Sequence, residues 1–237
     1  MNKKIVITGG TKGLGLAIAE KFTKGGFDVA LCARNADDLR ALDSSLAAMR
    51  VHESQKILTV KCDIRNKEEL KSFADDVLHA FGHVDVLVNN GGTFIPGQIY
   101  KEEDGLLEKL IETNLYSAYH LSRWLAGGMI ERRQGAIFNM CSVAGLKAYP
   151  NGGSYSISKF AMIGLSKSLR EELKEFYIKV TSLIPGATLT DSWKGVDLPA
   201  SRFMKPEDVA DIIWDIQHLS PNTVVEEVVL RPLLGDI

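Results

Sequence analysis

A hydroxyl, a phenol and an ammonium group stand within one short stretch of the chain, at Ser142, Tyr155 and Lys159. Tyr155 and Lys159 are four residues apart, so on a helix they project from the same face, about 6 Å apart at Cβ. A free phenol has a pKa near ~10, and a fixed ammonium beside it stabilises the phenolate and lowers that value. Tyr155 is therefore a candidate general acid/base, although the same spacing also occurs on any amphipathic helix.

A glycine-rich turn follows the first apolar run of the chain. It reads Thr8-Gly9-Gly10-Thr11-Lys12-Gly13-Leu14-Gly15 and leads into an amphipathic segment, residues 16–22. Such a turn lets backbone N–H groups approach a pyrophosphate, and the N-terminus of the following helix adds favourable partial charge. No Lys-Ser/Thr pair follows the last glycine, so the turn is not a P-loop. It predicts a dinucleotide site, the alternative being a turn that is merely tight.

The tip of the second expected strand indicates which dinucleotide is bound. An acidic residue there would bind the adenosine ribose 2′-hydroxyl of NAD, but the tip reads Leu31-Cys32-Ala33-Arg34-Asn35. Arg34 and Lys12 instead offer two cations for a 2′-phosphate. NADP(H) is therefore favoured over NAD(H), unless both cations are ordinary solvated surface charges.

Short apolar runs alternate with longer amphipathic segments along the chain. Seven runs are expected to form strands: residues 4–8, 29–33, 57–62, 84–89, 136–140, 180–184 and 224–230. Strands rich in Val, Ile and Leu, each separated by enough chain for a helix, predict a parallel sheet covered on both faces. We expect one α/β domain over residues 1–237, a Rossmann-type doubly wound sheet that binds its ligands at the carboxyl ends of the strands.

Polar residues follow two further strands. Asp63 comes after the third, where it either faces a ligand or starts the next helix. The sequence Asn89-Asn90-Gly91-Gly92 comes after the fourth. Residues 105–132 are expected to form one long helix. Asn114 lies within that helix, where it is either exposed or bonded to a loop.

Composition places the chain among ordinary globular proteins. Of its 237 residues, 45% are apolar and 24% are charged, and the formal net charge of -2 offers no basic footprint for nucleic acid. No apolar run is long enough to span a bilayer, and the first residues do not form a signal peptide, so we expect a cytoplasmic protein without membrane partners.

The cysteines and histidines do not indicate a metal site. Cys32, Cys62 and Cys141 form no C-x-x-C pair, and two of them lie in strand-like apolar runs. His79 and His83 have helical spacing but lack an evident third ligand. We expect neither disulfides nor a bound metal.

Taken together and in order, these residues resemble the short-chain dehydrogenase/reductase family over essentially the whole chain. The matching elements are Thr8-Gly9-x-x-x-Gly13-x-Gly15, Asp63, Asn89-Asn90-Gly91-Gly92, Asn114, Ser142, Tyr155-x-x-x-Lys159 and Pro185-Gly186-x-x-x-Thr190. Gly91 stands where the family usually has Ala.

The resemblance implies a role for each of these positions. Ser142 would bind the substrate carbonyl, Tyr155 would give it a proton, Lys159 would hold the nicotinamide ribose, and Asn114 would anchor a water that links Lys159 to solvent. Asp63 would contact adenine, and Asn90 the adenosine ribose side. The cofactor-binding residues implied in this way are Gly9, Thr11, Lys12, Gly13, Leu14, Gly15, Arg34, Asp63, Ile64, Asn90, Gly91, Tyr155, Lys159, Pro185, Gly186, Thr188 and Thr190.

The same resemblance suggests where the substrate lies. Residues 187–205 would cover it. The apolar side chains expected around it are Trp193, Val196, Leu198 and Phe203 of this segment, together with Leu146, Tyr149 and Pro150. The ending, residues 226–236, looks like the sepiapterin-reductase and 3-hydroxy-acid-dehydrogenase branches.

Two classes of function are compatible with these residues. The first is an NADP(H)-dependent carbonyl reductase acting on a small molecule, with a sepiapterin-like or 3-oxoacyl type of substrate. The second is a catalytically silent NADP(H)-binding redox sensor, which would not need all of Asn114, Ser142, Tyr155 and Lys159. The helices that carry Asn114 and Tyr155 are apolar on more than one side, and in the family they pair across a two-fold axis, so a homodimer or homotetramer is expected.

Overall fold

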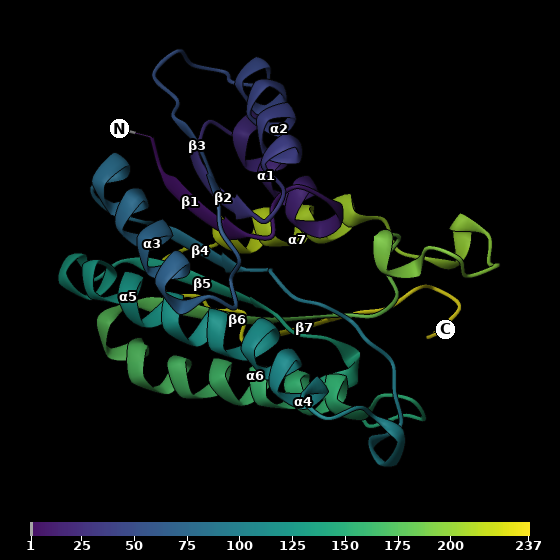
Figure 1. Ribbon diagram of the computed structural model, residues 1–237. Helices are drawn as coiled ribbons and strands as arrows, with labels where there is room; N and C mark the ends of the chain where they lie inside the picture. Colours follow the sequence, from purple (N-terminus) through teal and green to yellow (C-terminus); the bar gives the residue numbers. More distant parts are fainter. Residues whose placement is uncertain (1) are drawn as a thin grey trace.

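The chain folds around one parallel sheet with strand order β3-β2-β1-β4-β5-β6-β7 (Figure 1). The structure is a computed structural model and describes residues 2–237. The strands are β1 Lys4–Thr8, β2 Asp28–Ala33, β3 Ile57–Lys61, β4 Val86–Asn89, β5 Gly135–Met140, β6 Ile178–Pro185 and β7 Glu227–Leu230. The α-helices are α1 Gly13–Lys24, α2 Ala36–Ala48, α3 Lys67–Phe81, α4 Leu106–Ile111, α5 Ser117–Arg132, α6 Gly153–Leu173 and α7 Pro206–Gln217. The predicted doubly wound α/β fold is confirmed.

Helices cover both faces of the sheet. Successive side chains of a strand point to opposite faces. Ile5 and Ile7 of β1 therefore pack with α1, α2 and α7, whereas Val6 packs with α3, α5 and α6. Figure 1 shows these two groups of helices on either side of the sheet. Because β1, β2 and β4 are buried on both faces, apolar residues predominate along them without the alternation of a half-exposed strand.

The seven expected strands all form, with small shifts at their ends. β6 begins earlier than expected, while β4 and β7 begin later. The strand order reverses direction between β1 and β4, and such a point in a doubly wound sheet is where ligands bind.

The long helix expected over residues 105–132 is interrupted. α4 ends at Ile111, residues Glu112–Tyr116 form a π-helical turn, and α5 continues from Ser117. A π-helical turn inserts an extra residue into the helix and is frequent at functional sites. Hydrophobic periodicity did not reveal this turn because the apolar stripe runs along the helices on both sides of it.

Two classes of feature are absent from the described part of the chain. Within residues 2–237, no helix is long and apolar enough to cross a membrane. In the same range, no three His, Cys, Asp or Glu side chains come together as metal ligands. Cys32, Cys62 and Cys141 are free and buried.

Candidate active site

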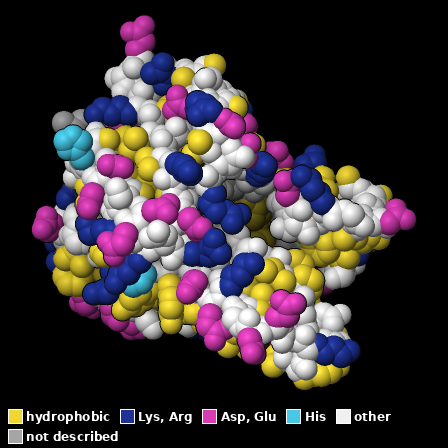
Figure 2. Space-filling view, in the orientation of Figure 1, with side chains coloured by type: hydrophobic (Ala, Val, Ile, Leu, Met, Phe, Trp, Pro, Cys, Tyr) yellow, Lys and Arg dark blue, Asp and Glu magenta, His cyan; other side chains and the backbone are white. Residues whose placement is uncertain are grey.

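The carboxyl ends of the strands open into one cleft of ≈ 1520 Å³. Figure 2 shows the hollow, with Lys and Arg side chains gathered beside it. Nearly all the site residues expected from the sequence line this cleft. Of the expected catalytic and cofactor-binding residues, the two that do not line it are Gly15, at the end of the glycine-rich turn, and Asn114, which lies behind Gly92.

The glycine-rich turn forms a cradle of backbone without side chains. Gly9 has a φ of 69°, which favours glycine. A Cβ on Gly15 would lie 2.2 Å from the Gly9 carbonyl oxygen and 2.6 Å from Asn90 Nδ2, so no side chain fits there. The turn continues into the N-terminus of α1 at Gly13. This cradle therefore fits a pyrophosphate, as the sequence predicts.

The turn is tied to the loop that follows β4. Asn90 Nδ2 donates to the carbonyl oxygens of Thr8 at 2.9 Å and Gly9 at 3.0 Å, and the Gly91 N–H donates to Thr8 Oγ1 at 2.8 Å. The amide nitrogen of Asn90 is thus used within the protein. A Cβ on Gly91 would lie 2.6 Å from Ile64 Cδ1, so an Ala at this position, as the resembled family usually has, would require the end of the Ile64 side chain to shift.

Ser142, Tyr155 and Lys159 meet beyond the end of β5. Ser142 follows this strand, and its Oγ accepts a hydrogen bond of 3.2 Å from the Ala144 N–H at the start of a 3₁₀ turn. Tyr155 and Lys159 lie in the first two turns of α6. Lys159 Nζ donates to the Met140 carbonyl oxygen at 2.8 Å and lies 5.8 Å from the centroid of the Tyr155 ring.

Burial shifts the pKa values of Tyr155 and Lys159 in opposite directions. It raises the pKa of the Tyr155 phenol, an effect that a hydrogen bond with Ser142 opposes. Burial also lowers the pKa of the Lys159 ammonium to about 8. In the chain alone the pKa of Tyr155 is therefore raised, not lowered as expected, because desolvation of the phenol outweighs the opposing hydrogen bond with Ser142.

Asn114 is buried in the π-helical turn and bonded to a loop, which was one of its two expected states. Its Oδ1 accepts from the Thr93 N–H at 2.8 Å, and its Nδ2 donates to the Thr93 carbonyl oxygen at 3.0 Å and to Ser158 Oγ at 2.9 Å. A Cβ on Gly92 would lie 3.1 Å from Asn114 Oδ1 and 3.7 Å from Lys159 Nζ, so the two side chains flank this glycine. The expected water relay remains a prediction.

Two cations were expected at the far end of the cleft, beside β2. Arg34 makes no ion pair within residues 2–237. Lys12, by contrast, is paired with Asp38, with 3.1 Å between Nζ and Oδ2. Lys12 is thus not the free point charge that the sequence suggested.

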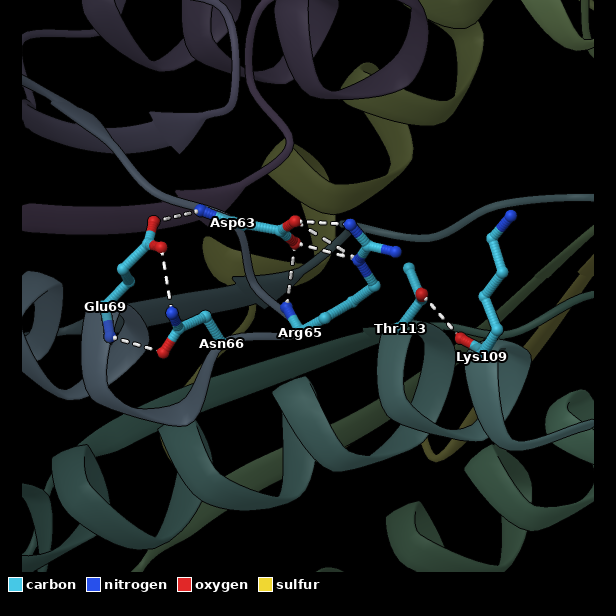
Figure 3. Close-up of polar contacts among 6 residues, drawn as sticks. All are labelled: Asp63, Arg65, Asn66, Glu69, Lys109 and Thr113. Carbon is cyan, nitrogen blue, oxygen red and sulfur yellow. Dashed lines mark hydrogen bonds and ion pairs between the residues drawn. The ribbon is translucent and has the colours of Figure 1, made fainter. Parts of the chain in front are cut away.

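Asp63 is not the residue that starts α3. The N-cap is Asn66, whose side chain accepts from the Glu68 and Glu69 N–H groups. Asp63 instead holds Arg65 through several hydrogen bonds (Figure 3). Its carboxylate therefore lines the cleft. Of the two alternatives expected from the sequence, this agrees with a residue that faces a ligand and not with one that starts the next helix.

The apolar residues expected around the substrate are only partly at the cleft. Trp193, Tyr149 and Pro150 line it, and Trp193 lies 5.2 Å from Phe203 between ring centroids. The residues that do not line it are Leu146, Val196, Leu198 and Phe203. The expected cover is fastened at its base, since the Leu189 N–H donates to Met204 O at 2.9 Å and the Met204 N–H to Ala187 O at 3.0 Å.

Sequence reasoning missed several cleft residues. Phe94 packs edge-on against Tyr155, with 4.8 Å between ring centroids. Arg231 and Asp236, an ion pair near the C-terminus, line the same cleft, as does Arg65. The position of Phe94 just after Asn89-Asn90-Gly91-Gly92 was an available signal. No comparable signal pointed to Arg231 and Asp236, because only the packing of β7 beside β6 brings the C-terminal residues to the cleft.

Glu102 is a further residue that the sequence did not single out. Its carboxylate accepts from the Ser154 N–H at 2.9 Å and from the Ser154 hydroxyl. A Cβ on Gly153 would lie 2.0 Å from Glu102 Oε1. The carboxylate thus binds the free N–H end of α6, one residue before Tyr155, and fixes the start of the helix that carries the phenol.

With this geometry in place, similarity to known proteins identifies the class. A family model described as short chain dehydrogenase matches residues 3–199. The sepiapterin reductase of Chlorobaculum tepidum is 31% identical over 100% of this chain and 99% of its own length.

Two solved structures are similar over the whole fold. An alcohol dehydrogenase from the archaeon Thermococcus sibiricus, complexed with 5-hydroxy-NADP, gives a TM-score of 0.90 at 25% identity, covering 100% of this chain and 99% of that one. The L-sorbose reductase of Gluconobacter frateurii, complexed with NADPH and L-sorbose, gives 0.89 at 29% identity, covering 98% and 95%. The chain therefore belongs to the short-chain dehydrogenase/reductase family of oxidoreductases, as its motifs suggested.

The contact between Glu102 and α6 leads to a stability prediction. Glu102→Ala leaves the first N–H groups of α6 without their carboxylate, and we expect the free energy of unfolding to fall by about 1–3 kcal/mol. Urea unfolding measures this loss. Glu103→Ala, at the exposed neighbouring position, is the control and should change stability little. Equal effects of the two variants would contradict the capping role.

Lys159 leads to a pH prediction. Its pKa is about 8 in the folded chain against an ordinary 10.5, so between these values the unfolded state binds more protons and stability rises with pH. Below pH 8 the side chain is charged in both states, and burying the ammonium lowers the stability by the full free energy that corresponds to the difference between the two pKa values. Lys159→Met should therefore be more stable than the wild type at pH 7 by about 1–3 kcal/mol, after allowing for the lost hydrogen bond. The advantage should disappear above pH 10.5.

Urea unfolding of both proteins across this pH range measures the difference. Lys167→Met, at an exposed position of the same helix, is the control for adding an apolar side chain. A stability difference between wild type and Lys159→Met that stays constant with pH would contradict the assignment.

Proposed function

We propose that this chain is an NADP(H)-dependent oxidoreductase that interconverts a carbonyl group and a secondary alcohol. The observation that carries the proposal is the meeting of Ser142, Tyr155 and Lys159 in the cleft that also holds the glycine-rich turn. A site that only bound a dinucleotide would not need a buried ammonium beside a phenol, because the buried ammonium raises the cost of folding.

The residues divide the chemistry between them. When bound, NADP(H) supplies or accepts the hydride at the carbonyl carbon. Ser142 and Tyr155 would hold the carbonyl oxygen through their hydroxyl groups, and Tyr155 would pass its proton to that oxygen during reduction. Lys159, held by the Met140 carbonyl oxygen, would then stabilise the phenolate. The product is a neutral alcohol, and solvent returns the proton to Tyr155.

The cofactor assignment rests on charge at the end of the cleft beside β2. Arg34 has no carboxylate partner within residues 2–237 and is available to a 2′-phosphate. The L-sorbose reductase and alcohol dehydrogenase neighbours were solved with NADPH and 5-hydroxy-NADP. Both observations agree with NADP(H) as the cofactor predicted from the sequence.

The substrate we propose is a small ketone of the sepiapterin or 3-oxoacyl type. Phe94, Tyr149 and Trp193 give the cleft near Tyr155 aromatic walls, which suit a planar or apolar substrate. The full-length relative named sepiapterin reductase supports the first of these types. Arg231 is paired with Asp236, so it does not by itself demand an anionic substrate.

We also propose a homodimer or homotetramer built on α5 and α6. Apolar side chains at Tyr116, Tyr119, Ile157 and Phe160 are exposed on the surface of these helices and the turn before them. Covering them in a two-fold contact would bury apolar area. Cytoplasmic localisation and the single-domain organisation of residues 1–237 remain predictions from the sequence.

The first experiment follows loss of NADPH absorbance with ketones, diketones, pterins and 3-oxoacyl thioesters. Tyr155→Phe should lose about 10³- to 10⁴-fold in kcat on any active substrate, because one hydroxyl serves both proton transfer and positioning. Its Kd for NADPH should be unchanged. Tyr149→Phe, which removes a phenol from the same cleft, is the control and should keep most activity. Tight NADPH binding with silence across the panel would favour the redox-sensor alternative.

The second experiment concerns Arg34. Charged hydrogen bonds contribute about 1.5–3 kcal/mol, so Arg34→Ala should lose roughly 10- to 100-fold in NADPH affinity while NADH changes little. Lys12→Ala should lose less, since Asp38 already balances that cation. Arg34→Asp should abolish or invert the preference, because its carboxylate repels the 2′-phosphate. The measurement is kcat/KM for both cofactors at two salt concentrations. A wild type that prefers NADH would overturn the charge assignment.

A further inference from the structure

Five charged side chains line the cleft where the adenosine half of the cofactor is expected. They are Lys12, Arg34, Asp38, Asp63 and Arg65. The two carboxylates are each matched by a cation, because Lys12 pairs with Asp38 and Arg65 pairs with Asp63. Arg34 makes no such pair among residues 2–237. Among these five side chains one positive charge is thus left unbalanced, and Arg34 carries it.

Asp63 and Arg65 lie on one loop, and Arg65 contacts both carboxylate oxygens of Asp63. Arg65 Nε lies 3.1 Å and 3.2 Å from the two carboxylate oxygens, and Nη2 lies 2.6 Å from Oδ2. The Arg65 N–H also donates to Oδ1 at 3.1 Å. Figure 3 shows the guanidinium facing the carboxylate. A forked contact of this kind holds both side chains in place.

Asp63 also lies beside Arg34, because the two residues directly follow Cys62 and Ala33, and the Cys62 N–H donates to the Ala33 carbonyl oxygen at 2.9 Å. The pKa of its carboxyl is lowered, first by the hydrogen bond from Arg65 and to a smaller extent by the charge of Arg34. Asp63 is therefore ionised at neutral pH. Without Arg65, this carboxylate would be the counter-ion of Arg34 and would repel any phosphate that Arg34 attracts.

We propose that Arg65 is a specificity-determining residue that acts through Asp63. By neutralising the carboxylate, it leaves Arg34 free to bind the 2′-phosphate of NADP(H). Arg65 need not touch the phosphate itself. The inference rests on the proposed NADP(H) function and adds to it a residue outside the resembled family's motif positions.

The experiment measures direct binding, so it does not depend on an active substrate. Kd values for NADPH and NADH are obtained from quenching of tryptophan fluorescence, since Trp193 lines the cleft. The proteins are the wild type, Arg65→Gln, Asp63→Asn, the double variant Asp63→Asn/Arg65→Gln, and Arg65→Lys. The quantity compared is Kd(NADH) divided by Kd(NADPH). This ratio cancels any change that affects both cofactors equally, such as a contact of Asp63 with adenine.

In Arg65→Gln, the exposed carboxylate should lower this ratio by about 5- to 20-fold at low salt, and by less at high salt. The double variant removes both charges and should return the ratio to within about threefold of the wild type. Asp63→Asn alone should leave the ratio equal or higher. Arg65→Lys keeps the cation, so it should keep the ratio and shows that the loop still folds.

Two results would overturn the inference. A ratio unchanged in Arg65→Gln would mean that Asp63 does not act on the phosphate. A double variant as poor as Arg65→Gln would mean that Arg65 contacts the phosphate directly. The wild-type ratio tests the proposed cofactor separately, because a preference for NADH would reject NADP(H) while the coupling between Asp63 and Arg65 could still be measured.

Discussion

The glycine-rich turn and the loop after β4 approach each other so closely that a Cβ on Gly15 would lie 2.6 Å from Asn90 Nδ2. Asn90 Nδ2 binds the carbonyl oxygens of Thr8 and Gly9, and the Gly91 N–H binds Thr8 Oγ1. A Cβ on Gly15 would collide with the Gly9 carbonyl. These contacts join β1 to β4 at the point where the strand order reverses. The remaining site depends on them, because they hold the backbone cradle open toward the cleft.

The proposed catalytic group of Ser142, Tyr155 and Lys159 includes a charged side chain that is costly to bury. Lys159 is buried and has a depressed pKa, yet its Nζ is retained by the Met140 carbonyl oxygen. The phenol of Tyr155 is also partly buried, against Phe94. A buried ammonium destabilises the native state and is kept where its chemistry is needed. The protein accommodates both side chains by fixing their surroundings, through Glu102 at the start of α6 and through Asn114 in the π-helical turn.

The charged side chains at the adenosine end of the cleft also depend on their surroundings. A cleft that binds a phosphate needs a cation whose charge is not already balanced by a carboxylate. Here the carboxylates of Asp38 and Asp63 each have a cation of their own. Arg34 is left available as a result. Which cation is free is therefore set by the whole group of charges, not by the residue type at one position.

The sequence by itself determined the fold class and the motifs that lie at the cleft. Continuous apolar runs such as Lys4–Thr8 mark strands buried on both faces, and glycine spacing marks the turn after β1. The spacing of Tyr155 and Lys159 is likewise local, so helix geometry is sufficient to bring them to one face. Even the Asp63–Arg65 contact was within reach of sequence reasoning, since it spans one turn of loop.

Only the tertiary structure decided the contacts between segments far apart in the chain. Glu102 caps the helix that begins at Gly153, Lys12 is balanced by Asp38, and the tail residues Arg231 and Asp236 reach the cleft. The pKa directions of Tyr155 and Lys159 also belong here, because desolvation depends on everything that surrounds a group. Periodicity and motifs report the local geometry of the backbone, whereas these features depend on which surfaces meet when the helices pack on the sheet.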